Sequence, residues 1–377
     1  MKIALVLDDS LDRPDGVQQY VLSVGRYLIA AGHDVHYVCS EATRDDLEGT
    51  LHSLARNVHV TFNGNGLKIP LPVSRRALRA FLERERFDVI HVQTPHSPLF
   101  SGRLVAAARR LQGAAVTIVG TFHILPNGRL AALATRALGV LLRRNLRLFD
   151  RFCAVSAPAA EFARRAFRID PIVIGIPIDV DALAAEGARG RTAREGSDEV
   201  RLAFLGRLVA RKGAIEFVEA LGALPASTRE RIHVTIGGRG PLAADVEKAI
   251  EEARLGAVVE MPGFVAEEEK AAFYAAADIA VFPAMGGESF GIVLIEAMAS
   301  GSDVVVGGDN PGYRSVLGEG ADTLVRPRDR AGFAAALARL IDDAGLRATI
   351  RAEQARRVRD FDVSTVGPRI ERLYASE

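Results

Sequence analysis

Residues 201–224 read RLAFLGRLVARKGAIEFVEALGAL, in which an apolar run, a basic loop containing glycine and a helical pattern follow one another. The run 201–206 has the length of a buried strand, and residues 213–224 place apolar side chains at helical spacing. The same succession recurs along the 377-residue chain. Nearly continuous apolar strands that alternate with helices are typical of parallel sheets covered on both faces, so the sequence predicts an α/β fold.

Two series of strands and helices are expected, one in each half of the chain. The first has strands at 2–7, 34–39, 58–62, 87–92, 115–121 and 151–155, with helices at 17–31, 74–86, 101–111, 128–148 and 157–167. The second has strands at 201–206, 232–237, 257–261, 279–282, 303–306 and 323–326, with helices at 213–224, 241–255, 266–277, 290–300 and 330–343. The polar stretch 187–198 has the composition of an exposed connection. We therefore expect two doubly wound, Rossmann-like domains that bind ligands beyond the carboxyl ends of their strands, in an interdomain cleft.

The charge balance excludes a globally basic nucleic-acid binder, since 48 Lys and Arg face 47 Asp and Glu. Residues 1–172 nevertheless carry 23 basic against 15 acidic residues, and residues 173–377 carry 25 against 32. The first half is therefore expected to face something anionic. The sequence has no run of about 18 apolar residues, and its first strand leads into two aspartates, so we expect a cytoplasmic protein without a signal peptide.

Two glycine-containing loops have the features of phosphate-binding sites. Gly16 opens a helix directly after the first strand, where free backbone N–H groups and the helix dipole attract an anion; an Asp15-capped turn is the alternative. The sequence there lacks Gly-x-Gly-x-x-Gly, which disfavours a nicotinamide dehydrogenase. Arg207 and Lys212, in the loop GRLVARKG, are placed to clamp a diphosphate, unless they are merely solvated charges.

The segment 286–298, GGESFGIVLIEAM, carries two glutamates with different expected roles. Glu288 follows a strand and is suited to accept hydrogen bonds from sugar hydroxyls. Glu296 lies eight residues further on, on nearly the same face if the segment is helical, and a carboxylate there suits a ribose diol. Its apolar neighbours require that it has a partner, the alternative being a surface glutamate.

His123 ends the strand segment TIVGTFH and is expected to donate a hydrogen bond to a sugar hydroxyl or to developing charge. A satisfied structural histidine is the alternative for His123, and the preferred interpretation for His91 and His96. Asp179 and Asp181 are better explained by a helix N-cap than by a metal site. We therefore expect neither a metal nor a cofactor, and inert core roles for Cys39 and Cys153.

Two basic segments of the first half favour contact with an anionic membrane. Residues 74–86, SRRALRAFLERER, have a net charge of +3, and residues 129–151 have a net charge of +5. Each basic residue near a bilayer surface contributes about 1 kcal/mol. Ordinary amphipathic helices, whose leucines pack on a core, explain the same pattern.

The segments GRLVARKG, ESFGIVLIEAMASG, GTFH and DGVQ together resemble the retaining glycosyltransferases of the fourth sequence family, which have the GT-B fold, and within it the mannosyltransferases that act on a membrane phospholipid. The resemblance covers nearly the whole chain. It implies donor-binding roles for Gly16, Val265, Lys270, Gly287, Ser289, Phe290, Gly291 and Glu296, and direct roles in transfer for His123, Arg207, Lys212 and Glu288. It implies acceptor contacts for Asp9, Gln18 and Asn63, and membrane contacts for Arg75, Arg76 and Arg79.

The resemblance implies a metal-independent, retaining transfer of a hexose, with mannose from GDP-mannose favoured and phosphatidylinositol as acceptor, by an enzyme peripheral on the inner face of the plasma membrane. The alternatives are a UDP-hexose-dependent transferase acting on a soluble polyol or glycan, and a nucleotide-sugar-binding protein that has lost catalysis. Because the last helix is expected to return to the first domain, the expected domains are 1–172 plus 363–377, and 173–362. The sequence departs from the family at Asp9, at Asp15, and in the spacing between Arg207 and Lys212, which is five residues where the family has six.

Overall fold

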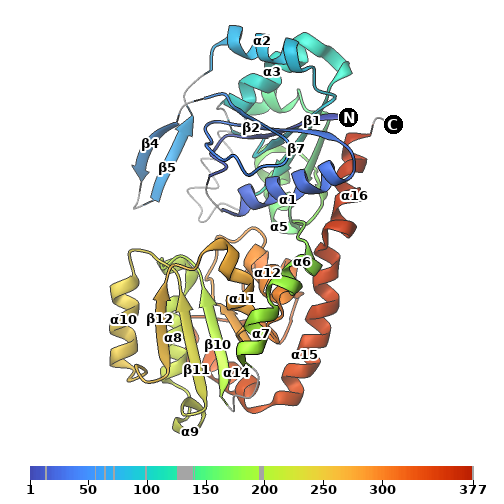
Figure 1. Cartoon of the computed structure of the whole chain (residues 1–377). Coiled ribbons are helices and arrows are strands. Elements are labelled where there is room, and N and C mark those ends of the chain that lie inside the picture. Colours follow the sequence, from blue (N-terminus) through green and yellow to red (C-terminus); the bar gives the residue numbers. More distant parts are fainter. Residues whose placement is uncertain are drawn as a thin grey trace. The chain divides into compact units, whose positions relative to one another are not determined.

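The fold was determined as a computed structural model that describes residues 1–12, 15–55, 57–62, 65–70, 73–97, 100–124, 139, 141–194 and 199–375. The chain divides into two compact units, which are treated separately below. The first unit comprises Met1–Pro177 together with Val363–Glu377, and the second comprises Ile178–Asp362. Both are α/β units built on parallel sheets, as the sequence predicts (Figure 1).

The first unit contains a seven-stranded parallel sheet in the order β3-β2-β1-β6-β7-β8-β9. Its strands are β1 (Lys2–Leu7), β2 (Asp34–Cys39), β3 (Thr50–Ser53), β6 (Val89–Gln93), β7 (Thr117–Phe122), β8 (Arg151–Ala154) and β9 (Ile172–Val173). Its helices are α1 (Gly16–Ala30), α2 (Arg75–Glu85), α3 (Phe100–Gln112), α5 (Ala157–Phe167) and α16 (Val363–Tyr374). The strand order reverses between β1 and β6, which is the kind of position where doubly wound sheets bind ligands.

One predicted strand of this unit belongs to a different sheet. Segment 58–62 was expected among the parallel strands, but β4 (Asn57–Phe62) pairs antiparallel with β5 (Asn65–Pro70) as a separate two-stranded sheet. Its sequence, NVHVTF, alternates polar and apolar residues. Such alternation is typical of a strand with one covered face, whereas strands buried on both faces are continuously apolar.

The second unit contains a six-stranded parallel sheet in the order β12-β11-β10-β13-β14-β15 (Figure 1). Its strands are β10 (Val200–Leu205), β11 (Ile232–Gly237), β12 (Val259–Gly263), β13 (Ile279–Phe282), β14 (Val304–Gly308) and β15 (Leu324–Val325). Its helices are α6 (Val180–Glu186), α7 (Ala188–Arg194), α8 (Ala214–Gly222), α9 (Ala226–Arg229), α10 (Ala243–Glu252), α11 (Lys270–Ala275), α12 (Ile292–Ser300), α13 (Pro311–Leu317), α14 (Arg330–Asp342) and α15 (Ala344–Arg357). The reversal here falls between β10 and β13.

The predicted connection at 187–198 is wrong for the part that the structure describes. Residues 188–194 form helix α7, which packs on α11. The contact is close, since a Cβ on Gly190 would lie 2.0 Å from the Ala272 carbonyl oxygen, and the Arg191 guanidinium donates to the Ser300 carbonyl at 2.9 Å. The polar residues of this segment therefore belong to a helix and not to an exposed connection. The units instead meet in sequence after Pro177, because β9 adds residues 172–173 to the first sheet.

Helix α16 packs beside α1 in the first unit (Figure 1). The Tyr27 hydroxyl donates to the Glu371 carboxylate at 2.6 Å, and His33 contacts the other oxygen of Glu371 at 2.8 Å. At its end, the Tyr374 hydroxyl lies 2.7 Å from Nδ1 of His91, and both side chains are buried. The last helix is therefore part of the first unit's core.

Cys39 and Cys153 are free and buried, and burial raises the pKa of each thiol to about 12. Both thiols therefore stay protonated at neutral pH, in agreement with inert core roles. Among the described residues, no helix combines the length and the hydropathy needed to span a bilayer.

Candidate functional site

A cluster of three charged side chains lies in the second unit, where β10 and β13 end at the switch point. The loop after β10 ends in a 3₁₀ turn, Ala210–Lys212, and the loop after β13 carries Glu288. The Lys212 ammonium lies 2.9 Å from Oε1 of Glu288, and the Arg211 guanidinium donates to the same oxygen. The structure therefore brings together two of the residues that the sequence analysis selected, Lys212 and Glu288, and adds Arg211 to them.

Glycines hold the two loops in place. Gly213, at φ 77°, ends the 3₁₀ turn, and a Cβ there would lie 2.1 Å from the Pro283 carbonyl oxygen of the other loop. The Met285 N–H donates to the Arg211 carbonyl at 2.9 Å. A Cβ on Gly312 would lie 2.2 Å from the carbonyl oxygen of Glu288. The loops thus approach one another through backbone contacts that side chains would obstruct.

Burial and charge act against each other within this cluster. Burial tends to raise the pKa of Glu288, but Lys212 and Arg211 outweigh it and lower that pKa below its ordinary value. Burial also lowers the pKa of Lys212, helped by the charges of Arg211 and Arg207, although Glu288 opposes them. Two cationic groups therefore contact one carboxylate, and the charge of a third, Arg207, acts on Lys212. An anionic ligand would relieve their repulsion, which is the electrostatic character expected of a diphosphate site.

Arg207 has a different environment from Arg211. Its side chain is exposed after the end of β10, yet its charge acts on Lys212. The sequence analysis selected Arg207 and missed Arg211, because both are loop arginines in the same eight-residue segment. The feature that distinguishes Arg211 from Arg207 is Gly213, whose left-handed backbone ends the 3₁₀ turn that contains Arg211.

The assumed helical relation between Glu288 and Glu296 is wrong. Helix α12 begins at Ile292, so Glu288 lies in the preceding loop with Gly287 and Ser289. Glu296 is only 8% exposed within α12, which excludes the surface-glutamate alternative. Its charge contributes, after burial, to raising the pKa of the Tyr274 hydroxyl.

Two further residues of this loop, Phe290 and Gly291, make packing contacts next to the site. Phe290 is buried and packs edge-on against Phe361, with ring centroids 5.3 Å apart. Gly291 has φ 138° and precedes α12, and a Cβ there would lie 2.8 Å from the Tyr313 ring. These contacts fix the direction in which the loop leaves β13 and enters the helix.

A hollow of about 650 Å³ beside β11, β12 and α11 is lined in part by Val265. Phe264, next to it, is 58% exposed, and the Arg239 guanidinium lies 5.4 Å from its ring centroid. Lys270 is engaged with Glu267 at 2.7 Å. Val265 and Lys270, which were predicted to bind the donor, thus lie at one end of the sheet, beside an exposed aromatic ring and a cation that can both stack.

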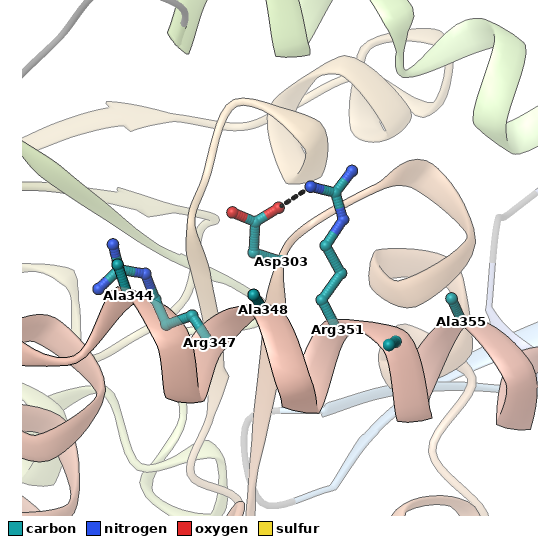
Figure 2. A pocket seen from close by; sticks show the side chains of 7 residues that line it. Asp303, Ala344, Arg347, Ala348, Arg351 and Ala355 are labelled. Carbon is teal, nitrogen blue, oxygen red and sulfur yellow. Dashed lines mark ion pairs between the residues drawn. The ribbon is translucent and has the colours of Figure 1, made fainter.

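A second hollow, of about 360 Å³, lies along α15 (Figure 2). Four alanines form its floor, and Arg351 pairs with Asp303 at 3.1 Å, as the dashed line shows. The Arg347 guanidinium donates to the carbonyls of Leu340 and Ile341, at the end of α14. Its arginines serve the fold, and this hollow lies near the start of β14, the opposite end from Glu288.

In the first unit, the acceptor-side prediction falls on the loop after β1. Helix α1 begins at Gly16, and Asp15 occupies the N-cap position without a capping hydrogen bond from its side chain. The buried Gln18 amide donates to the Ser10 carbonyl at 3.1 Å and lies 3.4 Å from Asp9. A further predicted position, Asn63, lies outside the described residues.

Asp8 was not selected from the sequence, although it is buried at the same strand end. Its carboxylate accepts hydrogen bonds from the Ser101 N–H at 2.8 Å and the Ser101 hydroxyl at 2.6 Å. Burial raises the pKa of Asp8, and the hydrogen bonds from Ser101 and Ser97 oppose that rise. Asp8 therefore fixes the start of α3 against β1. A charged residue directly after an apolar strand was the available signal.

His123 follows β7 and is buried. Its Nε2 lies 2.7 Å from Oε1 of Gln93, and its ring packs edge-on against Tyr20 at 4.8 Å. Burial, with the charges of His91 and His96, lowers the pKa of His123 to about 3. The imidazole is therefore neutral, and because an amide oxygen only accepts, Nε2 carries the hydrogen. The remaining nitrogen, Nδ1, is then an acceptor, whereas the sequence analysis expected a donor.

His91 is buried and His96 is half-buried, and burial lowers the pKa of His91 to about 3 and of His96 to about 4. His91 contacts Thr121 and Tyr374. These contacts agree with structural roles. Asp179 caps α6, since its carboxylate accepts from the Ala182 N–H at 2.9 Å, as predicted.

The basic helix α2 exposes the three arginines that were predicted to contact a membrane, Arg75, Arg76 and Arg79. Its apolar stripe, formed by Leu78, Phe81 and Leu82, is buried in the core of the first unit. The stripe is therefore not available to a bilayer, and any membrane contact of α2 must be electrostatic. Of the basic segment 129–151, residues 129–138 and 140 lie outside the described residues, whereas Arg143, Arg144 and Arg147 are described and exposed.

Comparison with known proteins places this chain in a family. The family model "Glycosyltransferase Family 4" matches residues 14–182, and "Glycosyl transferases group 1" matches residues 191–357. A phosphatidyl-myo-inositol mannosyltransferase of Mycolicibacterium smegmatis is 33% identical over 99% of this chain and 93% of its own length.

Solved structures share the fold. A glycosyltransferase from Rickettsia africae has a TM-score of 0.76 at 15% identity, covering 99% of this chain and 97% of its own. The Anabaena protein HepE, in complex with UDP and glucose, has a TM-score of 0.72 at 16% identity over the whole of both chains. The chain therefore belongs to the group 1 glycosyltransferases and has the GT-B fold.

Proposed function

We propose that this glycosyltransferase moves mannose from GDP-mannose to a phosphatidylinositol-like lipid, with retention at the anomeric carbon and without a metal ion. The name and the near full-length similarity of the mycobacterial relative support the sugar and the lipid. The observation that carries the proposal is the Glu288 carboxylate held by Arg211 and Lys212 at the switch point. This cluster supplies cationic groups for a diphosphate and an acceptor for a sugar.

The cluster suits the charge changes of the transfer. The bond between the anomeric carbon and the diphosphate oxygen breaks, the acceptor oxygen bonds to that carbon, and the acceptor proton leaves with the diphosphate. Negative charge grows on the leaving group, where Arg207, Arg211 and Lys212 stabilise it. As those cations turn to the diphosphate, Glu288 is released to accept hydrogen bonds from hexose hydroxyls. In this proposal Glu296 binds the ribose, His123 orients the hexose, and the start of α1 at Gly16 binds phosphate.

Ligand-induced stabilisation followed by turnover tests the donor and the reaction together. We expect GDP to raise the melting temperature more than UDP or ADP, and GDP-mannose to label phosphatidylinositol in liposomes. A preference for UDP with transfer to a soluble polyol or glycan would support the alternative donor. Stabilisation by a nucleotide without transfer to any acceptor would indicate a binding protein.

Removal of the exposed charges on α2 tests the membrane part of the proposal. Replacing Arg75, Arg76 and Arg79 with alanine should weaken transfer to anionic liposomes by at least about tenfold, given about 1 kcal/mol per basic residue. Hydrolysis of the donor should be unchanged. A matched control removes three exposed arginines of the second unit, Arg328, Arg339 and Arg356. Equal activity of both variants on liposomes would refute membrane binding through α2.

A further inference from the structure

Three potential metal ligands converge in the first unit, away from the strand ends that carry Asp9 and His123. They are His36 on β2, His52 on the edge strand β3 and Glu85 at the end of α2. One ligand atom from each lies within 4.8 Å of the others. Nδ1 of His36 is 2.7 Å from Nε2 of His52 and 3.9 Å from Oε2 of Glu85. Three separate elements thus bring two nitrogens and an oxygen close together, and the two nitrogens share a hydrogen bond.

The contacts of His36 define which of its nitrogens faces the cluster as an acceptor. Its Nε2 lies 3.1 Å from the Asp34 carboxylate and therefore carries a hydrogen. Nδ1 then presents a lone pair to His52 and Glu85. A carboxylate that holds the far nitrogen of an imidazole is the usual outer partner of a metal-bound histidine, because it fixes the tautomer and the ring orientation.

The surroundings favour a transition metal over calcium or magnesium. The His36 ring is packed edge-on by Phe87 at 5.2 Å, and the His52 ring by Phe81 at 5.0 Å. Two imidazoles and one carboxylate form a nitrogen-rich set, which suits zinc, whereas the hard cations take oxygen ligands. Zinc–nitrogen bonds of about 2.0 Å in a tetrahedron require the nitrogens to stand about 3.3 Å apart. The two rings would need to separate by about 0.6 Å to reach that spacing.

Lys2 is the group that competes with a cation here. Its ammonium lies 2.8 Å from the same Oε2 of Glu85, while Arg84 donates to Oε1 at 2.8 Å. The Lys2 side chain is 27% exposed and lies over the Phe87 ring, so its ammonium can turn to solvent without leaving the protein surface. Lys2 therefore stabilises the metal-free cluster and lowers the affinity for a divalent ion, which must displace it.

We propose that His36, His52 and Glu85 form a binding site for a divalent transition metal such as Zn²⁺, separate from the glycosyl-transfer residues and gated by Lys2. A bound ion joins the edge strand β3 to β2 and to the end of α2. The site does not depend on the proposed transfer reaction, and the two proposals fail independently.

Zinc titration of the untagged, chelator-treated full-length chain tests this site. We expect one tightly bound zinc ion per chain by calorimetry and by metal analysis after gel filtration, with Mg²⁺ unable to compete. Lys2→Met should bind zinc at least about tenfold more tightly, because a competing charge is removed while the apolar stem stays. His36→Asn and His52→Asn should lose the bound zinc.

Two controls separate a lost site from a lost fold. His233→Asn removes a histidine that pairs with Glu260 elsewhere, and should leave the zinc stoichiometry at the parental value. The metal-free melting temperature of each cluster variant shows whether it is folded. The proposal is overturned if neither the parent nor Lys2→Met binds zinc, or if folded His36→Asn and His52→Asn chains still bind it.

Discussion

The candidate residues of the two units differ in how they manage charge. In the second unit, Glu288 is ionised and compensated by Lys212 and Arg211 in direct contact. In the first unit, His123 is buried and neutral, and its contacts among the described residues, Gln93 and Tyr20, include no counter-ion. The charged cluster around Glu288 suits a charged diphosphate, and the neutral surroundings of His123 suit hydroxyl groups. The comparison therefore predicts where charge-changing substitutions act most strongly.

The largest effect is expected at Lys212. Lys212→Met should lower kcat/KM by about 10²–10³-fold, because a preorganised cation at the developing leaving-group charge is lost. Steady-state kinetics with the donor and an acceptor would measure it. Lys248→Met, which removes an exposed lysine of α10 paired with Glu252, is the matched control and should retain parental activity. Parental transfer by a folded Lys212→Met chain would contradict the diphosphate role.

The apolar strands and the motif residues were predictable from sequence because their signals are local. The runs 2–7, 34–39, 232–237 and 279–282 match the strands of the structure, since continuous apolar segments of that length bury both faces. Strand β3, TLHS, was missed because four mixed residues on a sheet edge carry no such pattern. Helix α15 was missed as well, because only Ile350 and Gln354 of its 14 residues are buried.

The contacts within the site could not be predicted, because they depend on tertiary structure. Arg211 was indistinguishable from Arg207 until the turn at Gly213 set its direction. Gln93 reaches His123 because β6 and β7 are neighbours with Gln93 opposite Thr121, and sequence alone does not give that register. The apolar stripe of α2 was left open between core and membrane, and only packing shows that the core takes it.

The free energy of unfolding at acid pH should show that His123 is neutral in the folded chain. The pKa of His123 is about 3 in the folded chain and near 6.5 when unfolded. Between these values the unfolded state binds a proton at His123 and the folded state does not. Stability is fully present above pH 6.5 and is lost as the pH falls below it, by about 2 kcal/mol at pH 5. His123→Gln should remove this part of the loss in denaturant titrations between pH 7 and 5, while the parts due to His91 and His96 remain. An unchanged slope would place the charge change elsewhere.

A carboxylate introduced beside His123 should give this neutral group of side chains a charge, as in the cluster around Glu288. Gln93→Glu places a negative group at Nε2 and raises the pKa of His123, so that the imidazole takes a second proton as the pH falls. Protonated Nδ1 cannot accept a hydrogen bond, and kcat/KM should fall about tenfold on the acid side while it recovers at higher pH. The pH–rate profile and the imidazole NMR shifts would report it. Gln93→Leu, which removes the hydrogen bond without adding charge, should lower kcat without creating this acid limb.

The smallest effect is expected from neutralising the carboxylate of the charged cluster. Because the folded pKa of Glu288 is lower than its ordinary value of 4.5, its contribution to stability is present above pH 4.5 and is lost as the pH falls through the folded value. Glu288→Gln should therefore be less stable than the parent at pH 7, and the difference should narrow in acid. Denaturant titrations at pH 7 and pH 3 would measure both values. Its pH window begins at 4.5, whereas that of His123 begins at 6.5, so Glu288 does not contribute to the loss between those two pH values. A difference that persists unchanged at pH 3 would mean that Glu288 contributes through packing rather than through its charge.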